Sequence, residues 1–497
     1  MGTMGRSSHT NSRAYVVGFI CIWLGLLAVG REKMLRDPGT FWHTIVGEDI
    51  LTTRSLPRTD GYSFTCEGHP WIAQQWLGEI GMAVVHRVAG LDGLLAVAAG
   101  IIAMVYGGIG GRLHRAGLRA PVIGILLMLS LAASAFHFFP RPHLGTLVGM
   151  YLCYSVLCDV ESGHARWSRL LWLPVVMVVW TNVHGGALGG LATILIVLFG
   201  WLVRPMDGRS TIMVGVAAVC CIIAVLVNPY GAALPALWLG LMGSKVLPQL
   251  MIEHAPLEVM SSDGLMVIVL AGAYLFTLAR AWPTNRRVTW LIPLVWLVMT
   301  YSRVRHGPLF AITAGIAIAD MAPFAKLGGL LELRKLDRAW WGAIAGLRAT
   351  PCALVLLALL VQRAGLAVPV VGKGWARPPA DYWPIETTEA LASLARETPG
   401  RVRLFNDMLF GGYLIYHAPW LPVYLDDRCE LYGDQGLLTY TRACADPAFF
   451  EAMAAYENLD AALVIARTTL DAHLASSAGW SRLASDHASS LYVRTRG

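Results

Sequence analysis

The sequence predicts an α-helical polytopic membrane protein with about 11 transmembrane helices and a small C-terminal α/β domain outside the membrane. Three observations lead to this prediction. Of the 497 residues, 56% are hydrophobic and only 14% are charged. The mean hydropathy is +0.55, far above the range of soluble globular chains. The apolar residues form runs long enough to cross a bilayer, and these runs end near residue 367.

A bilayer-spanning helix needs about 20 mostly apolar residues. Eleven runs approach this length, at residues 14–30, 91–111, 120–138, 143–159, 169–182, 186–203, 211–228, 264–281, 288–302, 307–323 and 350–367. The first run is predicted to be a helix rather than a cleaved signal peptide, because no small-residue cleavage site precedes the charged REKMLRD.

The Lys and Arg residues alternate between the predicted loops, and this alternation predicts the orientation of the chain. One set of loops is basic throughout: it contains Arg6 and Arg13, Arg112, Arg115 and Arg119, Arg166 and Arg169, Arg204 and Arg209, Arg280, Arg286 and Arg287, and KLGGLLELRKLDR with Arg348. The other set carries fewer basic residues. The N-terminus is therefore expected in the cytoplasm of a cell with the chain in its inner (plasma) membrane. The formal net charge of +7 reflects this orientation and does not indicate nucleic acid as a partner.

Four segments follow from this topology: a cytoplasmic N-terminus at 1–13, a transmembrane domain at 14–367 with a large first external loop at 31–90, a linker at 368–383, and an extracytoplasmic α/β domain at 384–497. The linker is rich in Pro and Gly. In the last domain, DPAFFEAMAAYEN has the pattern of an amphipathic helix. The predicted strands are RVRLFND, LPVYLDDR, AALVIA and SSLYVRTR.

Polar residues gather at the outer ends of the predicted spans, whereas the inner loops are short connectors. Ionisable residues at membrane depth are costly and usually line a polar cavity, so we expect a site that faces outward. The candidate substrate-binding residues are His43, Arg141, His143, Asn182, His184, Arg303, Arg305 and His306.

Three of these candidates are arginines on the outer side, against the usual charge pattern. A guanidinium group matches phosphate oxygens in bidentate geometry, which indicates a phosphate or diphosphate ligand. The alternative is that they snorkel to lipid headgroups. Asn182 and His184 could equally be hydrogen-bond partners between helices, and Asn228-Pro-Tyr-Gly could simply end a helix.

The stretch RDPGTFWHTIVGEDI directly follows the first span on the outer side, where a carboxylate would lie at the rim of the cavity. Asp37, Asp49 and, slightly further along, Asp60 are the candidate catalytic residues. The alternative for Asp37 is a capping role, because an Asp-Pro-Gly turn precedes a short amphipathic helix.

A first span followed at once by an acidic external loop resembles the C-type glycosyltransferase superfamily, near its protein mannosyltransferase and aminoarabinose transferase branches. Asp37 matches the acidic residue of that loop, whereas Pro38 stands where those branches have Glu. The chain is also similar, over nearly its whole length, to a widespread group of bacterial multi-span proteins near these transferases. The similar strings are DPGTFWHTIVGEDI, LPRTDGYSFT, HPWIAQQWLGE, RPH, WTNVHGG, NPYG, RVRH, FNDMLFGGYLIY and YLDDRCELYG.

This resemblance implies transfer of a sugar, with inversion, from a polyprenyl-phosphate donor to a glycan, lipid or protein acceptor at the outer face of the membrane. Asp37 would act as the base, and Asp49 or Asp60 would orient the acceptor, bind a metal or replace Asp37 as base. Arg303 and Arg305, helped by Arg141 and His143, would hold the lipid phosphate. Two external carboxylates could hold a divalent cation, although the sequence does not require one.

Two competing functions share these features. A transporter or lipid flippase also carries scattered Arg, Asn and His within its spans. A surface-polysaccharide polymerase or ligase would use an outward-facing site with lipid-linked oligosaccharides. In the C-terminal domain, Asn406, Asp407, Asp426, Asp427 and Arg428 are expected to cover the site or select the acceptor. Alternatively, Asp426, Asp427 and Arg428 form a structural ion-pair cluster.

Overall fold

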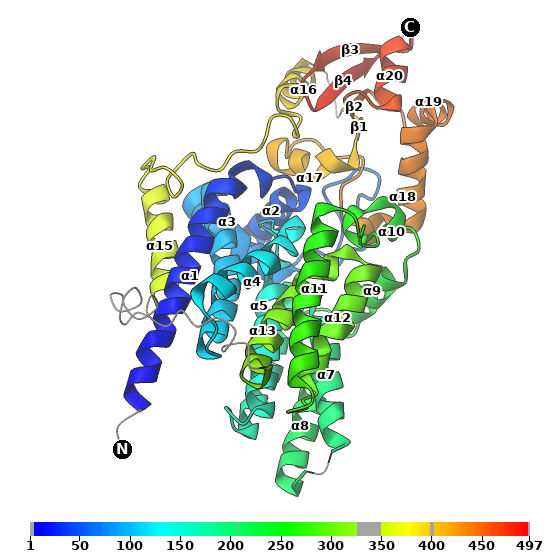
Figure 1. The fold of residues 1–497 in the computed structure, drawn as a ribbon. Coiled ribbons are helices and arrows are strands. Elements are labelled where there is room, and N and C mark those ends of the chain that lie inside the picture. The colour runs from blue at the N-terminus through cyan, green and yellow to red at the C-terminus, as the bar shows by residue number, and fades with distance from the viewer. Residues whose placement is uncertain (1–3, 205, 326–348, 398–401, 496–497) are drawn as a thin grey trace. The chain divides into compact units, whose positions relative to one another are not determined.

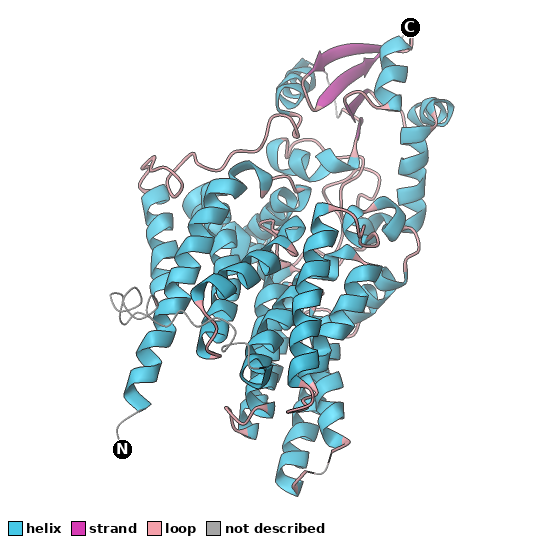
Figure 2. Cartoon of the chain, viewed as in Figure 1, coloured by secondary structure: helices cyan, strands magenta, loops and turns pink. Residues whose placement is uncertain are grey.

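A computed structural model of the chain describes residues 4–204, 206–325, 349–397 and 402–495. It is predominantly helical and has one four-stranded sheet near the C-terminus (Figures 1 and 2). The predicted fold class is confirmed. The predicted inner loop with KLGGLLELRKLDR and Arg348 lies outside the described residues.

The chain divides into two compact units. The first, here called the bundle unit, comprises Met1–Gly30, Val88–Ala236 and Pro248–Trp375. The second, here called the mixed unit, comprises Arg31–Arg87, Leu237–Leu247 and Ala376–Gly497. The first loop, Arg31–Arg87, therefore shares a unit with the C-terminal tail, Ala376–Gly497.

The bundle unit is built from apolar helices, two of which, α1 and α3, are partly in the mixed unit. They are α1 (Met4–Lys33), α3 (Trp76–Arg115), α4 (Ala120–Ala132), α5 (Leu144–Glu161), α6 (Trp172–Val183), α7 (Ala187–Leu202), α8 (Gly208–Ala224), α11 (Ser262–Ala281), α12 (Ile292–Ser302), α13 (Gly307–Ala325) and α15 (Thr350–Arg363). Short 3₁₀ turns connect several of them: η1 (Ala135–His137), η2 (Trp167–Leu171), η3 (Ile252–His254), η4 (Thr289–Leu291) and η5 (Val304–His306).

Five of the described helical segments are long and apolar enough to cross a membrane: Tyr15–Lys33, Trp76–Arg115, Leu144–Glu161, Ser262–Ala281 and Val304–Ala325. The other six predicted spans each coincide with a shorter apolar helix. Large apolar side chains are exposed on these helices, for example Val175, Phe199, Ile212 and Phe276. Exposure of so much apolar surface is stable only in contact with lipid, so the protein is a multi-pass membrane protein.

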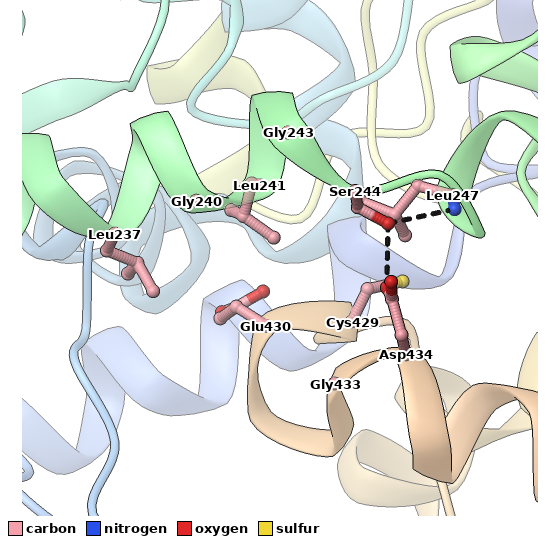
Figure 3. A pocket seen from close by; sticks show the side chains of 10 residues that line it. All are labelled: Leu237, Gly240, Leu241, Gly243, Ser244, Leu247, Cys429, Glu430, Gly433 and Asp434. Carbon is pink, nitrogen blue, oxygen red and sulfur yellow. Dashed lines mark hydrogen bonds between the residues drawn. The ribbon is translucent and has the colours of Figure 1, made fainter.

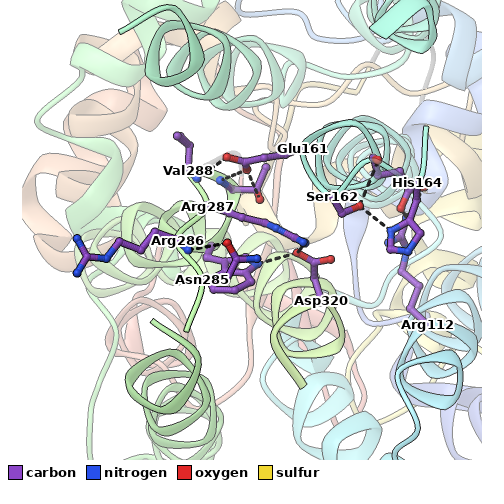
Figure 4. A network of polar contacts seen from close by, with 12 residues as sticks. Arg112, Glu161, Ser162, His164, Asn285, Arg286, Arg287, Val288 and Asp320 are labelled. Atoms are coloured by element: carbon purple, nitrogen blue, oxygen red, sulfur yellow. Dashed lines mark hydrogen bonds and ion pairs between the residues drawn. The ribbon is translucent and has the colours of Figure 1, made fainter. Parts of the chain in front are cut away.

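In the bundle unit, connections between helices are held by a partly buried ion pair and by hydrogen bonds to backbone N–H groups (Figure 4). Glu161, at the end of α5, accepts hydrogen bonds from the backbone N–H groups of Val288 and Thr289 at 2.7 and 2.8 Å. Asp320 of α13 accepts from Arg287 and from the indole of Trp290. These contacts satisfy the polar groups that a short turn exposes inside an apolar bundle.

The mixed unit contains helices from both ends of the chain. They are α2 (Pro38–Thr53), the first turns of α3, most of α9 (Ala233–Gly243), α16 (Ile385–Glu397), α17 (Met408–His417), α18 (Cys429–Ala445), α19 (Pro447–Tyr456) and α20 (Thr469–Ser476). The short helix α10 (Leu247–Leu250) begins at Leu247, the last residue of the segment Leu237–Leu247 of this unit. Helices α2 and α17 pack closely, since a Cβ on Gly412 would lie 2.4 Å from the carbonyl oxygen of Pro38.

The sheet has the order β1-β2-β4-β3, formed by β1 (Leu404–Asn406), β2 (Ala461–Ile465), β3 (Trp480–Ser485) and β4 (Ser489–Arg494). β1 pairs in parallel with β2, and the other pairs are antiparallel. The prediction of a strand at LPVYLDDR is wrong, and β3 was not predicted. Val423 makes only an isolated bridge to Ser63 of the first loop. The amide of Asn406 bonds the backbone of Tyr424 and Leu425, which holds this segment beside β1 without a ladder.

A fully buried arginine joins the first loop to the tail. Arg428 donates to Asp60 at 2.7 Å and to both carboxylate oxygens of Asp426 at 2.9 and 2.7 Å. All three side chains have zero exposure. The rings of Trp42, Tyr62 and Trp71 lie within 5.9 Å of the guanidinium group. The structural alternative for Asp426 and Arg428 therefore matches the observed contacts.

We predict that Arg428→Met destabilises the mixed unit by about 3–5 kcal/mol, because two buried carboxylates lose their counter-charge. Denaturant unfolding of the purified protein in detergent measures this loss. The matched control is Arg442→Met, whose ion pair with Asp446 is exposed and should contribute about 1 kcal/mol or less. Equal stability of the two variants would contradict the prediction.

Candidate functional site

The predicted site residues fall in both units. Asp37, His43, Asp49 and Asp60 lie in the mixed unit. The others lie in the bundle unit, and these are Arg141, His143, Asn182, His184, Arg303, Arg305 and His306.

In the bundle unit, six of the seven predicted residues gather at the ends of helices, together with three that were not predicted. His143 is the N-cap of α5, His184 the C-cap of α6, and Arg303 the C-cap of α12. We call the whole group the Arg–His cluster; its members are His137, Arg141, His143, His184, Glu253, His254, Arg303, Arg305 and His306.

Three histidines of the cluster lie ring to ring. The centroids of His137 and His143 are 4.2 Å apart, and those of His143 and His184 are 6.3 Å apart. His143 donates through Nε2 to the carbonyl oxygen of His137 at 2.7 Å. Its Nδ1 is then the lone-pair atom of a neutral ring, and within the described residues this buried atom has no hydrogen-bond partner.

The tautomer of His184 follows from its neighbours. Its Nδ1 accepts the backbone N–H of Gly186 at 3.0 Å, so this nitrogen carries no proton. Thr146 must then donate its hydroxyl proton to the same nitrogen, at 2.8 Å, while it accepts from the indole of Trp180 at 3.0 Å. The neutral ring of His184 therefore presents Nε2–H as a donor.

On the facing turns, arginine and glutamate surround His254. Arg305 lies 2.5 Å from its Nε2 and Arg303 lies 3.4 Å from its Nδ1. A neutral imidazole has one lone-pair nitrogen, so only the shorter contact, with Arg305, is a full hydrogen bond. Glu253 lies 3.9 Å from His137 and 4.0 Å from His254.

The electrostatics of the cluster keep its histidines neutral. Burial lowers the pKa of His137 to about 3, and burial together with Arg305 lowers the pKa of His254 to about 3. Burial also places the pKa values of His143 and His184 well below the ordinary value. For Glu253, burial alone would raise the pKa, but Arg305, Arg141 and two histidines outweigh it and lower the pKa. The charged groups of the cluster are thus the guanidinium groups of Arg141, Arg303 and Arg305 and the carboxylate of Glu253.

Asn182, the predicted residue outside the cluster, and His306, a member of the cluster, both make local hydrogen bonds. The amide of Asn182 donates to the carbonyl oxygens of Val178 and Val227 at 2.8 and 2.9 Å, which ties α6 to the segment after α8. His306 donates through Nδ1 to the carbonyl oxygen of Met299 at 3.0 Å. The alternative of an interhelical bond thus describes Asn182 well.

The sequence offered a signal for the missed residues. His137 stands six positions before His143 in HFFPRPH, and Glu253 and His254 form the pair in IEHAP. Both strings lie at predicted outer span ends. Only the fold shows that they meet the arginines.

In the mixed unit, each predicted carboxylate has a hydrogen-bond partner. Asp37 is buried and caps α2, accepting the N–H of Thr40 at 3.1 Å. Asp49 accepts from the phenol of Tyr62. Asp60 binds Arg428 and the Ser63 hydroxyl, so its oxygens serve the buried ion pair.

His43 lies on the same helix as Asp37 and is fully buried. Its Nδ1 is 2.9 Å from a carboxylate oxygen of Glu79, which lies in the first turn of α3. Helix α2 approaches this turn closely, because a Cβ on Gly47 would lie 2.0 Å from the carbonyl oxygen of Glu79. Among the described residues, no group of three His, Cys, Asp or Glu side chains is arranged to hold a metal ion.

Comparison with known proteins is informative for the fold. No family model and no curated protein matches the sequence. The apo oligosaccharyltransferase of Archaeoglobus fulgidus aligns with 91% of this chain and 69% of its own, at 11% identity and a TM-score of 0.53. The two proteins share a fold. ArnT from Cupriavidus metallidurans, in its apo state, aligns over 96% of this chain and 97% of its own, at 14% identity and a TM-score of 0.49. The fold shared with the oligosaccharyltransferase confirms, for the fold, the predicted resemblance to the C-type glycosyltransferases.

We predict that acid destabilises the bundle unit. The folded pKa values of His137 and His254, about 3, lie below that of an unfolded His, about 6.5. Full stability is present above pH 6.5, and each such His costs about 1.4 kcal/mol per pH unit as the pH falls from there toward 3. Unfolding curves at pH 7.5, 6.5 and 5.5 measure this slope.

In the variant His254→Gln, the free energy of unfolding should depend less steeply on pH, by the contribution of one proton. In His164→Gln, a change outside the cluster, the pH dependence should be that of wild type. The same slope in wild type and His254→Gln would contradict the assignment of a neutral buried imidazole.

Proposed function

We propose that this protein is an integral-membrane glycosyltransferase that moves a sugar from a polyprenyl-phosphate donor to a glycan, lipid or protein acceptor, with inversion, on the extracytoplasmic face. The observation that carries the proposal is the Arg–His cluster, which brings three guanidinium groups and neutral imidazole donors together at the helix ends of an apolar bundle. The shared fold of an oligosaccharyltransferase supports transfer chemistry over a transporter or flippase.

The cluster suits the leaving group of this reaction. When the bond between the anomeric carbon and the phosphate oxygen breaks, polyprenyl phosphate leaves and gains negative charge. Arg141, Arg303 and Arg305 would stabilise this charge more in the transition state than in the ground state. The Nε2–H of His184 would add a donor that carries no charge of its own.

The acceptor hydroxyl must lose a proton as its oxygen attacks the sugar. Asp37 is the proposed base, from its place directly after the first span. Asp60 is the weaker candidate, because both of its oxygens are bonded within the buried ion pair. If Asp37 only caps α2, Asp49 is the next candidate for the base.

For the phosphate-binding role we predict that Arg305→Ala weakens binding of undecaprenyl phosphate by about 10–100-fold, the value of a charge-assisted hydrogen bond. Binding of this lipid to the protein in nanodiscs gives the measurement. The matched control is Arg286→Ala, whose side chain is exposed over Trp282. Arg287 is unsuitable as a control because it pairs with the partly buried Asp320. Equal affinities of both variants for undecaprenyl phosphate would indicate that Arg305 contacts lipid headgroups instead.

For the base we predict that Asp37→Asn lowers the transfer rate by about 10²–10⁴-fold. Asparagine keeps the capping oxygen, so the unfolding temperature should hold. The control is Asp381→Asn, an exposed carboxylate paired with the neighbouring Arg36. Transfer within a few-fold of wild type would move the role to Asp49.

The proposed orientation places the N-terminus in the cytoplasm of a cell with an inner (plasma) membrane and the C-terminal tail outside, on the basis of the alternating basic loops. A reporter active only outside the cytoplasm should be active after residue 370 or near Gly68, and silent near Gly117 or Gly208. An inactive fusion after residue 370 would refute this topology.

A further inference from the structure

A cavity of about 390 Å³ lies within the mixed unit, between α9 and the first turns of α18 (Figure 3). Its volume falls in the range of about 300–1,000 Å³ that small-molecule sites occupy. One wall is apolar and glycine-containing, with Leu237, Gly240 and Leu241. The opposite wall carries the carboxylates of Glu430 and Asp434.

Both carboxylates are held in place by other residues. Ser244 donates to Asp434 at 2.7 Å and itself accepts the N–H groups of Val246 and Leu247, each at 3.2 Å. Glu430 accepts from the indole of the buried Trp71 at 3.3 Å. These contacts orient acceptor oxygens toward the space without filling it.

A second layer supports Glu430. The indole of Trp238 donates to the amide oxygen of Gln74 at 2.7 Å, so the amide nitrogen of Gln74 is free to donate to Glu430, with which it is bonded. A carboxylate bonded by one indole N–H and by an amide that a second indole holds in place is a preorganised acceptor.

The lining selects the chemistry of a ligand. The described lining residues include carboxylates but no Lys, Arg or His, so an anion would be repelled and a ligand with hydroxyl or ammonium donors would be favoured. The leucines and glycines of α9 offer an apolar surface for a ring. A sugar ring combines hydroxyl donors with an apolar C–H face.

We propose that this cavity binds a neutral or cationic sugar unit, with Glu430 and Asp434 accepting its hydroxyl or ammonium groups. The inference rests on the proposed function in naming that sugar as part of the acceptor. It adds a binding site that does not involve the Arg–His cluster.

Binding of simple sugars to the full-length protein in nanodiscs, without any donor, tests the proposal. Saturation-transfer NMR would compare methyl glucoside, glucosamine and glucuronate at equal concentration. Methyl glucoside and glucosamine should bind and glucuronate should not. Glu430→Gln should weaken glucosamine by about tenfold, the value of a hydrogen bond to a charged group, while Glu386→Gln, an exposed carboxylate elsewhere in the unit, should not.

A filling variant separates this cavity from other sugar contacts. A side chain at Gly240 meets no atom within 4 Å of its Cβ, so Gly240→Phe should fold and occupy the space. Its matched control is Gly215→Phe in α8, where the Cβ is equally unobstructed. Loss of binding in Gly240→Phe alone supports the site.

Glucuronate binding as tight as glucosamine binding, no sugar binding in wild type, or equal binding in the two Phe variants would overturn the proposal. Arg305→Ala should keep sugar binding. Sugar binding without transfer activity under any condition would reject the proposed function but leave the cavity assignment standing.

Discussion

The mixed unit depends on one buried charge. The guanidinium group of Arg428 binds Asp426, two positions before it, and Asp60, which precedes it by 368 residues. Leaving any of these charges unpaired in an apolar interior is costly, so the first loop and the tail must meet. The bridge from Ser63 to Val423 and the bond from Trp71 to Glu430 lie beside this ion cluster. The loop after the first span is therefore part of the folded tail unit.

In the bundle unit, the charged groups of the Arg–His cluster lie among neutral histidines. Arg305 and Arg141 act on the carboxylate of Glu253, and the histidines of the cluster stay neutral because burial and the neighbouring guanidinium groups oppose protonation. A cluster built only from structural ion pairs would balance its charges. This one places guanidinium groups beside neutral imidazoles at helix ends, and guanidinium groups are the donors that match the oxygens of a phosphate.

The carboxylates illustrate why residue type does not assign a role. Asp37, Asp49 and Asp60 stand within 24 positions of one another, yet one caps a helix, one accepts from a phenol and one balances a buried arginine. Glu430 was not a candidate by spacing or motif. It lines a cavity because Trp71 and Gln74, from the other end of the chain, hold it there.

The sequence by itself determined the membrane class, the positions of eleven apolar helices, three of the four strands and the arginines at the ends of the predicted spans, because hydrophobic run length and residue chemistry are local properties. Only the tertiary structure decided that LPVYLDDR pairs with the first loop instead of forming a strand, that His137 and Glu253 join the arginines, and that Asp60 belongs to Arg428. These are contacts between segments far apart in the chain, and their free energies depend on burial and on which charges meet. A local sequence pattern shows neither the burial of a side chain nor which charges meet. The partners of a buried charge are therefore known only from the folded structure.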